Sequence, residues 1–150
     1  MKKITTATFK MDKGDIIFRL LEETPIHTNA FINNANTGNF NGVNFYRLIQ
    51  NWIAQTSPKI AGNRMWDELK PPRRLKDNNM HFFGVLSSAN AGEEHTSIGA
   101  FFICLGRWRG KAQDKSYTTF GHILSGWENI ERIEQGDIIN DVIINTYTLN

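Results

Sequence analysis

Apolar and polar residues alternate along much of this chain, and alternation with a period of two predicts β-strands. Two alternating runs, residues 6–11 and 15–20, are separated by the turn Asp12-Lys13-Gly14. Two strands joined by a short turn that contains glycine predict an amino-terminal β-hairpin. Further runs rich in β-branched and aromatic residues predict strands at residues 45–49, 52–55, 84–89, 100–105, 117–124 and 141–149.

A helical period of apolar residues follows the hairpin. Thr24 and Pro25 predict its start, because threonine is common at the N-cap and proline at the first helical position. Gly38 predicts its end, because glycine commonly terminates a helix. An apolar stripe connects these two ends, and it consists of Ile26, Ala30, Phe31 and Ala35. The sequence therefore predicts a helix of about three turns that packs one face on a sheet.

A second, shorter helix is predicted near the carboxyl terminus, where Trp127, Ile130 and Ile133 recur every three residues ahead of Gly136. The complete pattern gives about eight strands and two helices, without an internal repeat or a linker. Many short strands with few helices favour a β-barrel or a β-sandwich over a parallel α/β sheet. We expect the chain to form one domain, residues 1–150.

Composition argues against several classes of function. Hydrophobic residues make up 40% and charged residues 21% of the chain, as in soluble globular proteins. The formal net charge of +2 gives no electrostatic basis for nucleic-acid binding, and we interpret the basic cluster at residues 70–76 as a solvated loop. No stretch approaches the roughly 20 apolar residues that span a bilayer. Residues 1–6 lack the apolar segment of a secretion signal, so we expect a cytoplasmic location, with a processed exported form as the alternative.

Residues that bind metals and nucleotides do not form their usual patterns in this sequence. Cys104 is the one cysteine, which excludes an internal disulfide and a cysteine-based zinc site. It lies in an apolar run, where we expect a buried thiol that acts as a small hydrophobe. No glycine-rich phosphate loop follows a predicted strand. The histidines lack metal-ligand spacing, and they are His27, His81, His95 and His122. We therefore expect no metal and no cofactor.

The segment from residue 45 to residue 55 is the most informative for function. Two short apolar runs flank a turn at Gln50-Asn51, with Arg47 in the first run and Gln55 at the end of the second. A β-hairpin whose polar side chains alternate outward would explain both residues. The alternative is a cleft in which a cation donates hydrogen bonds among apolar side chains, because a charge in such a setting needs partners. These eleven residues alone leave both interpretations open.

Short motifs in a fixed order extend through nearly the whole chain. They are Gly14-Asp15-Ile16, Thr24-Pro25, Asn29-Ala30-Phe31, Phe45-Tyr46-Arg47, Trp52-Ile53-Ala54-Gln55, the run from Gly84 to Asn90, Phe101-Phe102-Ile103, Thr119-Phe120-Gly121, Gly126-Trp127-Glu128 and Asp141-Val142-Ile143-Ile144. In these motifs the chain resembles the cyclophilin-type peptidyl-prolyl cis-trans isomerases. The resemblance implies a mainly β fold, a closed eight-stranded antiparallel β-barrel capped by two α-helices.

The resemblance also implies how the site works. Arg47 would donate hydrogen bonds to the prolyl nitrogen or to a carbonyl of the twisted amide, so that it stabilises the transition state more than either planar ground state. Gln55 would hydrogen-bond Arg47 or the substrate carbonyl, and Asn90 would hold the extended substrate through its backbone. The pocket for the proline ring and its surroundings would be formed by Tyr46, Trp52, Ile53, Ala89, Phe102 and Tyr117.

Four departures from the family pattern affect these expectations. Tyr46 stands where histidine is usual, and Thr56-Ser57-Pro58 replaces two glycines and an acid after Gln55. Ala100 replaces a glutamine that would hydrogen-bond substrate. The family's rim tryptophan aligns with Ala112, and Trp108 fills that place only if the loop inserts after it. We therefore expect weaker substrate binding and weak cyclosporin binding.

Three interpretations of function remain. The first is an isomerase that acts on exposed proline-containing segments of client proteins and assists their folding. The second is a degenerate cyclophilin that binds such segments without turnover, as the losses at Ala100 and at residues 56–58 suggest. The third is an unrelated β-barrel that carries a small ligand. No heptad pattern or obvious sticky edge strand indicates obligate assembly, so we expect a monomer.

Overall fold

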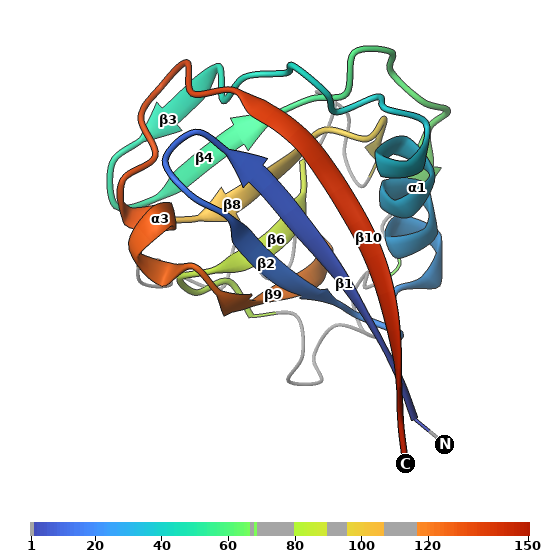
Figure 1. The fold of residues 1–150 in the computed structure, drawn as a ribbon. Helices are drawn as coiled ribbons and strands as arrows, with labels where there is room; N and C mark the ends of the chain where they lie inside the picture. Colours follow the sequence, from blue (N-terminus) through green and yellow to red (C-terminus); the bar gives the residue numbers. More distant parts are fainter. Residues whose placement is uncertain (1, 67, 69–79, 90–95, 107–116) are drawn as a thin grey trace.

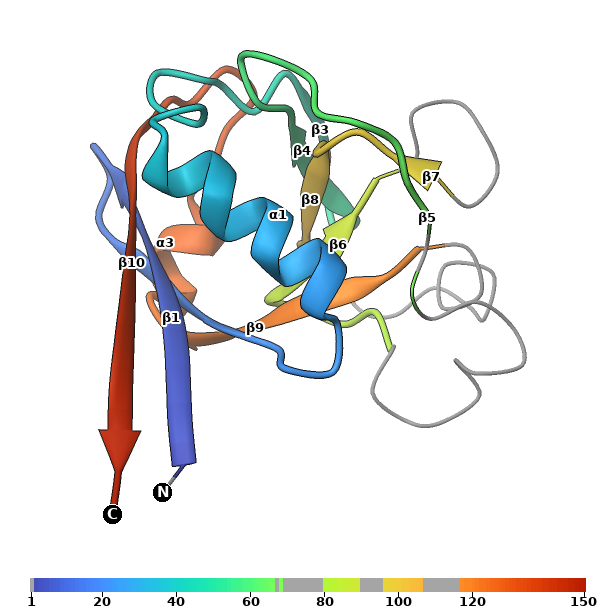
Figure 2. The same cartoon turned by 90° about the vertical axis from the view of Figure 1, so that its right-hand side faces the viewer.

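An antiparallel sheet that curves around an aromatic core dominates the structure, a computed structural model that describes residues 2–66, 68, 80–89, 96–106 and 117–150 (Figure 1). Within these residues the sheet has eight strands. In spatial order they are β10 (Ile139–Leu149), β1 (Lys2–Met11), β2 (Ile16–Leu20), β9 (Thr119–Ser125), β6 (Val85–Ser88), β8 (Phe101–Cys104), β4 (Ile53–Thr56) and β3 (Arg47–Ile49). Helix α1 (Pro25–Asn36) runs between the β1–β10 pair and strands β4, β6 and β8 (Figure 2). The short helix α3 (Trp127–Glu131) packs against the same core as α1, at the opposite end of the curved sheet (Figure 1).

The alternating and β-branched or aromatic runs predicted these eight strands correctly, including the hairpin of β1 and β2. It missed a second, two-stranded sheet, formed by β5 (Met65–Trp66) and β7 (Thr96–Ser97). Each strand has only two residues, too few to show a period of two. Strand β5 therefore falls in a segment where the sequence predicted no strand.

The expected closed barrel is wrong, because the sheet stays open between its edge strands β3 and β10. The chain before β3 meets the chain around the start of β10 through one isolated bridge, Asn44 with Ile138. Four backbone hydrogen bonds join the two segments around this bridge. They run from Gly42 N to Ile139 O at 2.8 Å, from Ile139 N to Val43 O at 2.9 Å, from Phe45 N to Asp137 O at 3.0 Å and from Gly136 N to Phe45 O at 2.9 Å. Strand β3 is only three residues long, and β10 then follows β1 in a long ribbon, so no ladder forms between the two edges (Figure 1).

Phenylalanine rings fill the space between α1 and the sheet. Phe101 on β8 lies at their centre, with ring centroids 5.3 Å from Phe40, 5.5 Å from Phe31 and 5.9 Å from Phe9. All three of these contacts are edge-on, one of the arrangements that aromatic quadrupoles favour. Because Phe101 is fully buried, its neighbour Phe102 must point to the opposite face of the same strand. The core thus fixes the direction of the residue that lines the candidate site.

Helix α1 begins at Pro25 as predicted, but it buries a partly different face. Ile26 is 56% exposed, whereas His27 is buried beside Phe31. The Thr24 side chain occupies the N-cap position without capping the helix. The Glu68 carboxylate caps it instead, accepting hydrogen bonds from the backbone N–H groups of Ile26 and His27, each at 2.8 Å.

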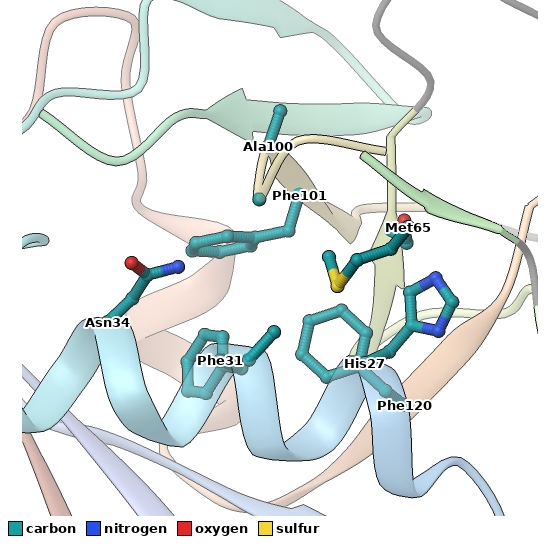
Figure 3. A pocket seen from close by; sticks show the side chains of 10 residues that line it. His27, Phe31, Asn34, Met65, Ala100, Phe101 and Phe120 are labelled. Carbon is teal, nitrogen blue, oxygen red and sulfur yellow. The ribbon is translucent and has the colours of Figure 1, made fainter. Parts of the chain in front are cut away.

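The buried face of α1 packs against the sheet and the β5 segment and leaves little space between them. Figure 3 shows His27, Phe31 and Asn34 of the helix facing Met65, Ala100, Phe101 and Phe120. The space left between them is about 10 Å³, enough for roughly one water molecule. This pocket is a packing gap rather than a site for a peptide.

Glycine follows the end of α1 but not the end of α3. Gly38 follows α1 with a φ of +74°, as predicted for a helix stop, and its N–H donates to Ala35 O at 3.2 Å. Helix α3 is shorter than the apolar spacing suggested and leaves Ile133 beyond its end, although Ile133 is buried. Trp127 is 49% exposed and stacks on Phe83, with centroids 5.7 Å apart and planes 14° from parallel.

Candidate active site

The β3–β4 hairpin places Arg47 and Gln55 directly opposite one another. Side chains alternate between the two faces of a strand, so the neighbouring pair, Leu48 and Ala54, points toward the core. Ala54 is fully buried, and Arg47 is exposed. Arg47 and Gln55 therefore lie on the outer face of the hairpin, as simple alternation predicts. Whether they also form a site depends on the side chains around them.

Apolar side chains surround this polar pair on the adjoining strands. Strand β8 lies beside β4 with Phe102 opposite Gln55, and a cleft of about 120 Å³ opens between them. Seven of the nine predicted site residues line it, namely Arg47, Trp52, Ile53, Gln55, Ala89, Phe102 and Tyr117. Tyr46 reaches the same group through a hydrogen bond to Gln55. Asn90 lies outside the described residues, as do Trp108 and Ala112.

A chain of hydrogen bonds orients the arginine. Arg47 Nη1 donates to Gln55 Oε1 at 3.1 Å, and Gln55 Nε2 donates to the Tyr46 hydroxyl at 3.1 Å. The Tyr46 hydroxyl also lies 3.1 Å from Ser57 Oγ. Among the described residues Arg47 makes no ion pair, so its charge is held by an amide and is not neutralised by a carboxylate. The remaining guanidinium N–H groups can donate to a ligand.

The floor of the cleft is a stack of rings. Phe102 meets Tyr117 edge to face, with centroids 5.6 Å apart, and His81 stacks behind Phe102 at 5.9 Å. His81 is 1% exposed, and its Nε2 lies 2.8 Å from Ser87 Oγ. Sequence reasoning missed this histidine as a part of the site, because no spacing in the sequence connects residue 81 with residue 102. These ring contacts restrict the orientation of Phe102.

Two of the four departures from the family pattern, at Tyr46 and in the segment after Gln55, have hydrogen-bond partners in the described residues. Thr56 is buried and donates from Oγ1 to Asn44 O at 2.7 Å, while Ser57 meets Tyr46. Ala100 is 8% exposed and packs in the cluster that contains Phe102, so it brings no hydrogen-bond donor to the cleft. Cys104 belongs to the same cluster and is buried, which confirms its interpretation as a small hydrophobe.

Ionisable groups with a shifted pKa lie away from this cleft. Burial lowers the pKa of His122, which stands on β9. Burial raises the pKa of Glu68, but hydrogen bonds from His27 and Ile26 outweigh it and hold the pKa below its usual value. The described residues contain no group of three or more histidine, cysteine, aspartate or glutamate side chains placed to hold a metal ion. None of the described helices is long and apolar enough to cross a membrane.

Comparison with known proteins shows which sequences this chain is similar to. A family profile described as cyclophilin type peptidyl-prolyl cis-trans isomerase/CLD matches residues 3–148. The chain is 32% identical over 155 residues to a peptidyl-prolyl cis-trans isomerase of Helicobacter pylori, covering 97% of this chain and 90% of the relative. It is 27% identical over 157 residues to human peptidyl-prolyl cis-trans isomerase-like 3, covering 97% and 96% of the two chains.

Solved structures agree with the fold. The crystal structure of a Cryptosporidium parvum cyclophilin-type peptidyl-prolyl cis-trans isomerase matches with a TM-score of 0.77 at 20% identity, covering 95% of this chain and 98% of that one. A structure of the same protein in the presence of the dipeptide Ala-Pro matches with a TM-score of 0.76 at 21% identity, covering 93% and 98%. The fold is therefore that of the cyclophilins. With the family profile matching almost its whole length, the chain belongs to the cyclophilin-type peptidyl-prolyl cis-trans isomerases, a family of enzymes.

Proposed function

We propose that this protein accelerates rotation about Xaa-Pro bonds, with Arg47 as the catalytic residue. The observation that carries the proposal is an exposed arginine without a carboxylate partner among the described residues, oriented by Gln55 beside an apolar cleft. A guanidinium in an ion pair would already be engaged. A guanidinium held by a neutral amide keeps its charge and most of its donors for a ligand.

The reaction needs no covalent intermediate. Rotation about the bond removes amide resonance, against a barrier of roughly 18–20 kcal/mol. When the bond is twisted, the prolyl nitrogen regains a lone pair that can accept a hydrogen bond. Arg47 donates to this nitrogen, or to the adjacent carbonyl, and this contact is stronger in the twisted state than in either planar state. The rate rises because the interaction lowers the energy of the transition state more than that of the substrate.

The cleft supplies the binding energy and the position. Phe102, Ile53 and Trp52 present apolar surface to the proline ring, with Ala89 and Tyr117 at the rim. Gln55 orients Arg47 or donates a hydrogen bond to the substrate carbonyl, and Tyr46 accepts a hydrogen bond from Gln55. Asn90 would hold the extended peptide through its backbone. Because Ala100 offers no donor, we expect weaker binding of substrate than a glutamine there would give.

The physiological substrates follow from this chemistry. An open cleft beside a cation suits exposed, extended segments of client chains, so we propose a role in assisting protein folding. We place the protein in the cytoplasm, acting as a monomer of one domain, with weak affinity for cyclosporin. The alternative is a chain that binds proline peptides without turnover, and the experiment below separates the two.

Cis-trans exchange in a short proline peptide, followed by NMR exchange spectroscopy, tests the proposal directly. Arg47→Ala should lower the acceleration at least tenfold, about 1.4 kcal/mol of transition-state stabilisation. Arg19→Ala, which removes an arginine of β2 away from the cleft, is the matched control and should retain the activity. Binding of the peptide by a folded wild type without acceleration would support the non-catalytic alternative. Equal acceleration by Arg47→Ala would refute the assignment of Arg47.

A further inference from the structure

A second concave surface lies on the other side of the β3–β4 hairpin from the candidate active site. It is a groove of about 750 Å³ between the hairpin and the end of α3. Its size falls within the range of ligand-binding clefts. Its lining residues are Leu48, Gln50, Asn51, Phe83, Leu105, Ile130, Glu131, Ile133, Glu134 and Gln135. None of them belongs to the cleft around Arg47.

The floor of the groove is apolar and only partly covered. Leu48, Phe83 and Leu105 are half-buried side chains from three separate segments, each packed on its inner side against the main core. Phe83 also stacks on Trp127, which is 49% exposed, so the apolar surface continues beyond the groove. Contiguous exposed apolar surface on a protein of this size commonly marks an interaction site. Exposed tryptophan is among the residues that contribute most at such sites.

The rim of the groove is negatively charged. Glu131 and Glu134 are both exposed, and no lysine or arginine lines the groove among the described residues. The nearby Arg132 donates to Lys13 O at 2.7 Å and to the Asn129 side chain, so its guanidinium is engaged with the β1–β2 turn.

The two carboxylates at the rim differ in their pairing. Lys13 Nζ lies 3.0 Å from Glu134, whereas the described residues contain no ion-pair partner for Glu131. The field at the groove therefore favours a positive ligand, with Glu131 as its least compensated charge.

Amide groups complete the rim in a way that suits a peptide. Gln50 and Asn51 form the exposed tip of the hairpin, and each carries both a donor and an acceptor. Gln135 Oε1 accepts from Leu48 N at 3.3 Å, and this bond connects the segment after α3 to the strand beside the groove. The groove thus offers an apolar floor for apolar side chains, carboxylates for basic side chains and amides for an extended backbone. These features suit a peptide that carries both apolar and basic residues.

We propose that this groove binds peptide segments in which an aliphatic or aromatic residue is flanked by lysine or arginine. The site is separate from the cleft of Arg47 and does not require proline. Leu48 and Arg47 are neighbours on β3 with side chains on opposite faces, so one hairpin contributes to both surfaces. A client chain long enough to contact both would be held at two points, which raises its effective affinity.

The test uses the full chain, labelled with ¹⁵N, and the proline-free peptide acetyl-Lys-Leu-Phe-Arg-Lys-amide. Amide shifts of residues 48, 83, 105 and 133 should move together and saturate, and Arg47→Ala should bind equally well. Glu131→Lys should weaken binding about threefold or more, as expected for the loss of one exposed ion pair and its replacement by repulsion. Glu22→Lys makes the same charge change at an exposed position outside the groove and should leave the affinity unchanged.

Several results would overturn the proposal. These are shifts confined to the Arg47 cleft, no saturable shifts at millimolar peptide, and equal binding of acetyl-Glu-Leu-Phe-Asp-Glu-amide. Concentration-dependent shifts at the same residues without peptide would assign the groove to a second copy of this chain instead. Because the peptide lacks proline, these outcomes do not depend on isomerase activity, and loss of activity in Arg47→Ala would leave this test intact.

Discussion

The Tyr46 hydroxyl is expected to control the orientation of Arg47, the proposed catalytic residue, through Gln55. It accepts from Gln55 Nε2 at 3.1 Å and can donate its own proton to Ser57 Oγ at 3.1 Å. These contacts fix the Gln55 amide so that its oxygen faces Arg47. Tyr46→Phe removes the acceptor, and a flipped amide would then present its NH₂ group to the guanidinium, donor against donor.

The size of the effect follows from the setting of this bond. A neutral hydrogen bond contributes about 0.5–1.5 kcal/mol net. Because Tyr46 is 46% exposed, water replaces part of the loss, which places the effect at the lower end of that range. We therefore expect Tyr46→Phe to lower the catalysed exchange rate roughly two- to fivefold. NMR exchange spectroscopy measures it, and Tyr147→Phe, at an exposed position of β10, is the matched control.

A double-mutant cycle separates orientation from direct contact with substrate. If Tyr46 acts through Gln55, Tyr46→Phe should cause no further loss in a Gln55→Ala background. A Tyr46→Phe enzyme with the full wild-type rate would refute the reasoning. Additive losses in the double variant would show instead that the tyrosine contacts the substrate on its own account.

Three other predictions follow from the structure. Activity should be nearly constant between about pH 6 and 9, because a guanidinium stays charged throughout, and a bell-shaped rate profile centred near a histidine pKa would contradict the role of Arg47. The lowered pKa of Glu68 means that its stabilisation of α1 is complete above the unfolded pKa of about 4.3 and is lost as pH falls through the lower folded pKa. Thermal melts from pH 7 to pH 3 should therefore show a larger decrease in Tm for wild type than for Glu68→Gln, and parallel decreases would exclude this contribution. Gly106→Ala should destabilise the fold by about 1–3 kcal/mol, because its Cβ would lie 1.8 Å from Asn51 O, whereas Gly62→Ala meets its nearest atom at 3.6 Å and should be tolerated. Urea unfolding checks this pair, and equal midpoints would contradict it.

Local pattern predicted the strands well for two reasons. Strands β1 and β2 bury alternate residues, which appears in the sequence as alternation, and β6 and β8 are buried throughout, which appears as short apolar runs. It predicted the wrong face at the start of α1, because burial there is set by a residue far along the chain. Glu68 caps the helix and lies 2.7 Å from His27 Nδ1, so a polar histidine is buried while Ile26 stays exposed. No period in residues 25–36 contains that information. The same limit applies to His81, which reaches the cleft through contacts with Phe102 and Tyr117.

Whether the sheet closes into a barrel also could not be predicted from the local sequence pattern. Alternation counts strands but does not say whether the first and last of them meet. Here the edge segments touch through the Asn44–Ile138 bridge and then diverge, so the opening remains between β3 and β10. The site residues on β3, β4 and β8 were predicted from motifs that resemble a family, and the registers of those strands explain why Arg47, Gln55 and Phe102 converge.

The substitutions after Gln55 need not weaken the enzyme in the way their sequence suggests. Glycines in this position would leave the backbone free, and their loss suggested a stiffened, degenerate site. In the structure, Thr56 donates to Asn44 O and Ser57 meets the Tyr46 hydroxyl, so both new side chains hold the segments that position Arg47. Tyrosine at position 46 and serine at position 57 form one hydrogen-bonded pair, and each departure from the family pattern supports the other. The missing donor at Ala100 has no such compensation among the described residues, so reduced substrate affinity is expected to arise there rather than at residues 56–58.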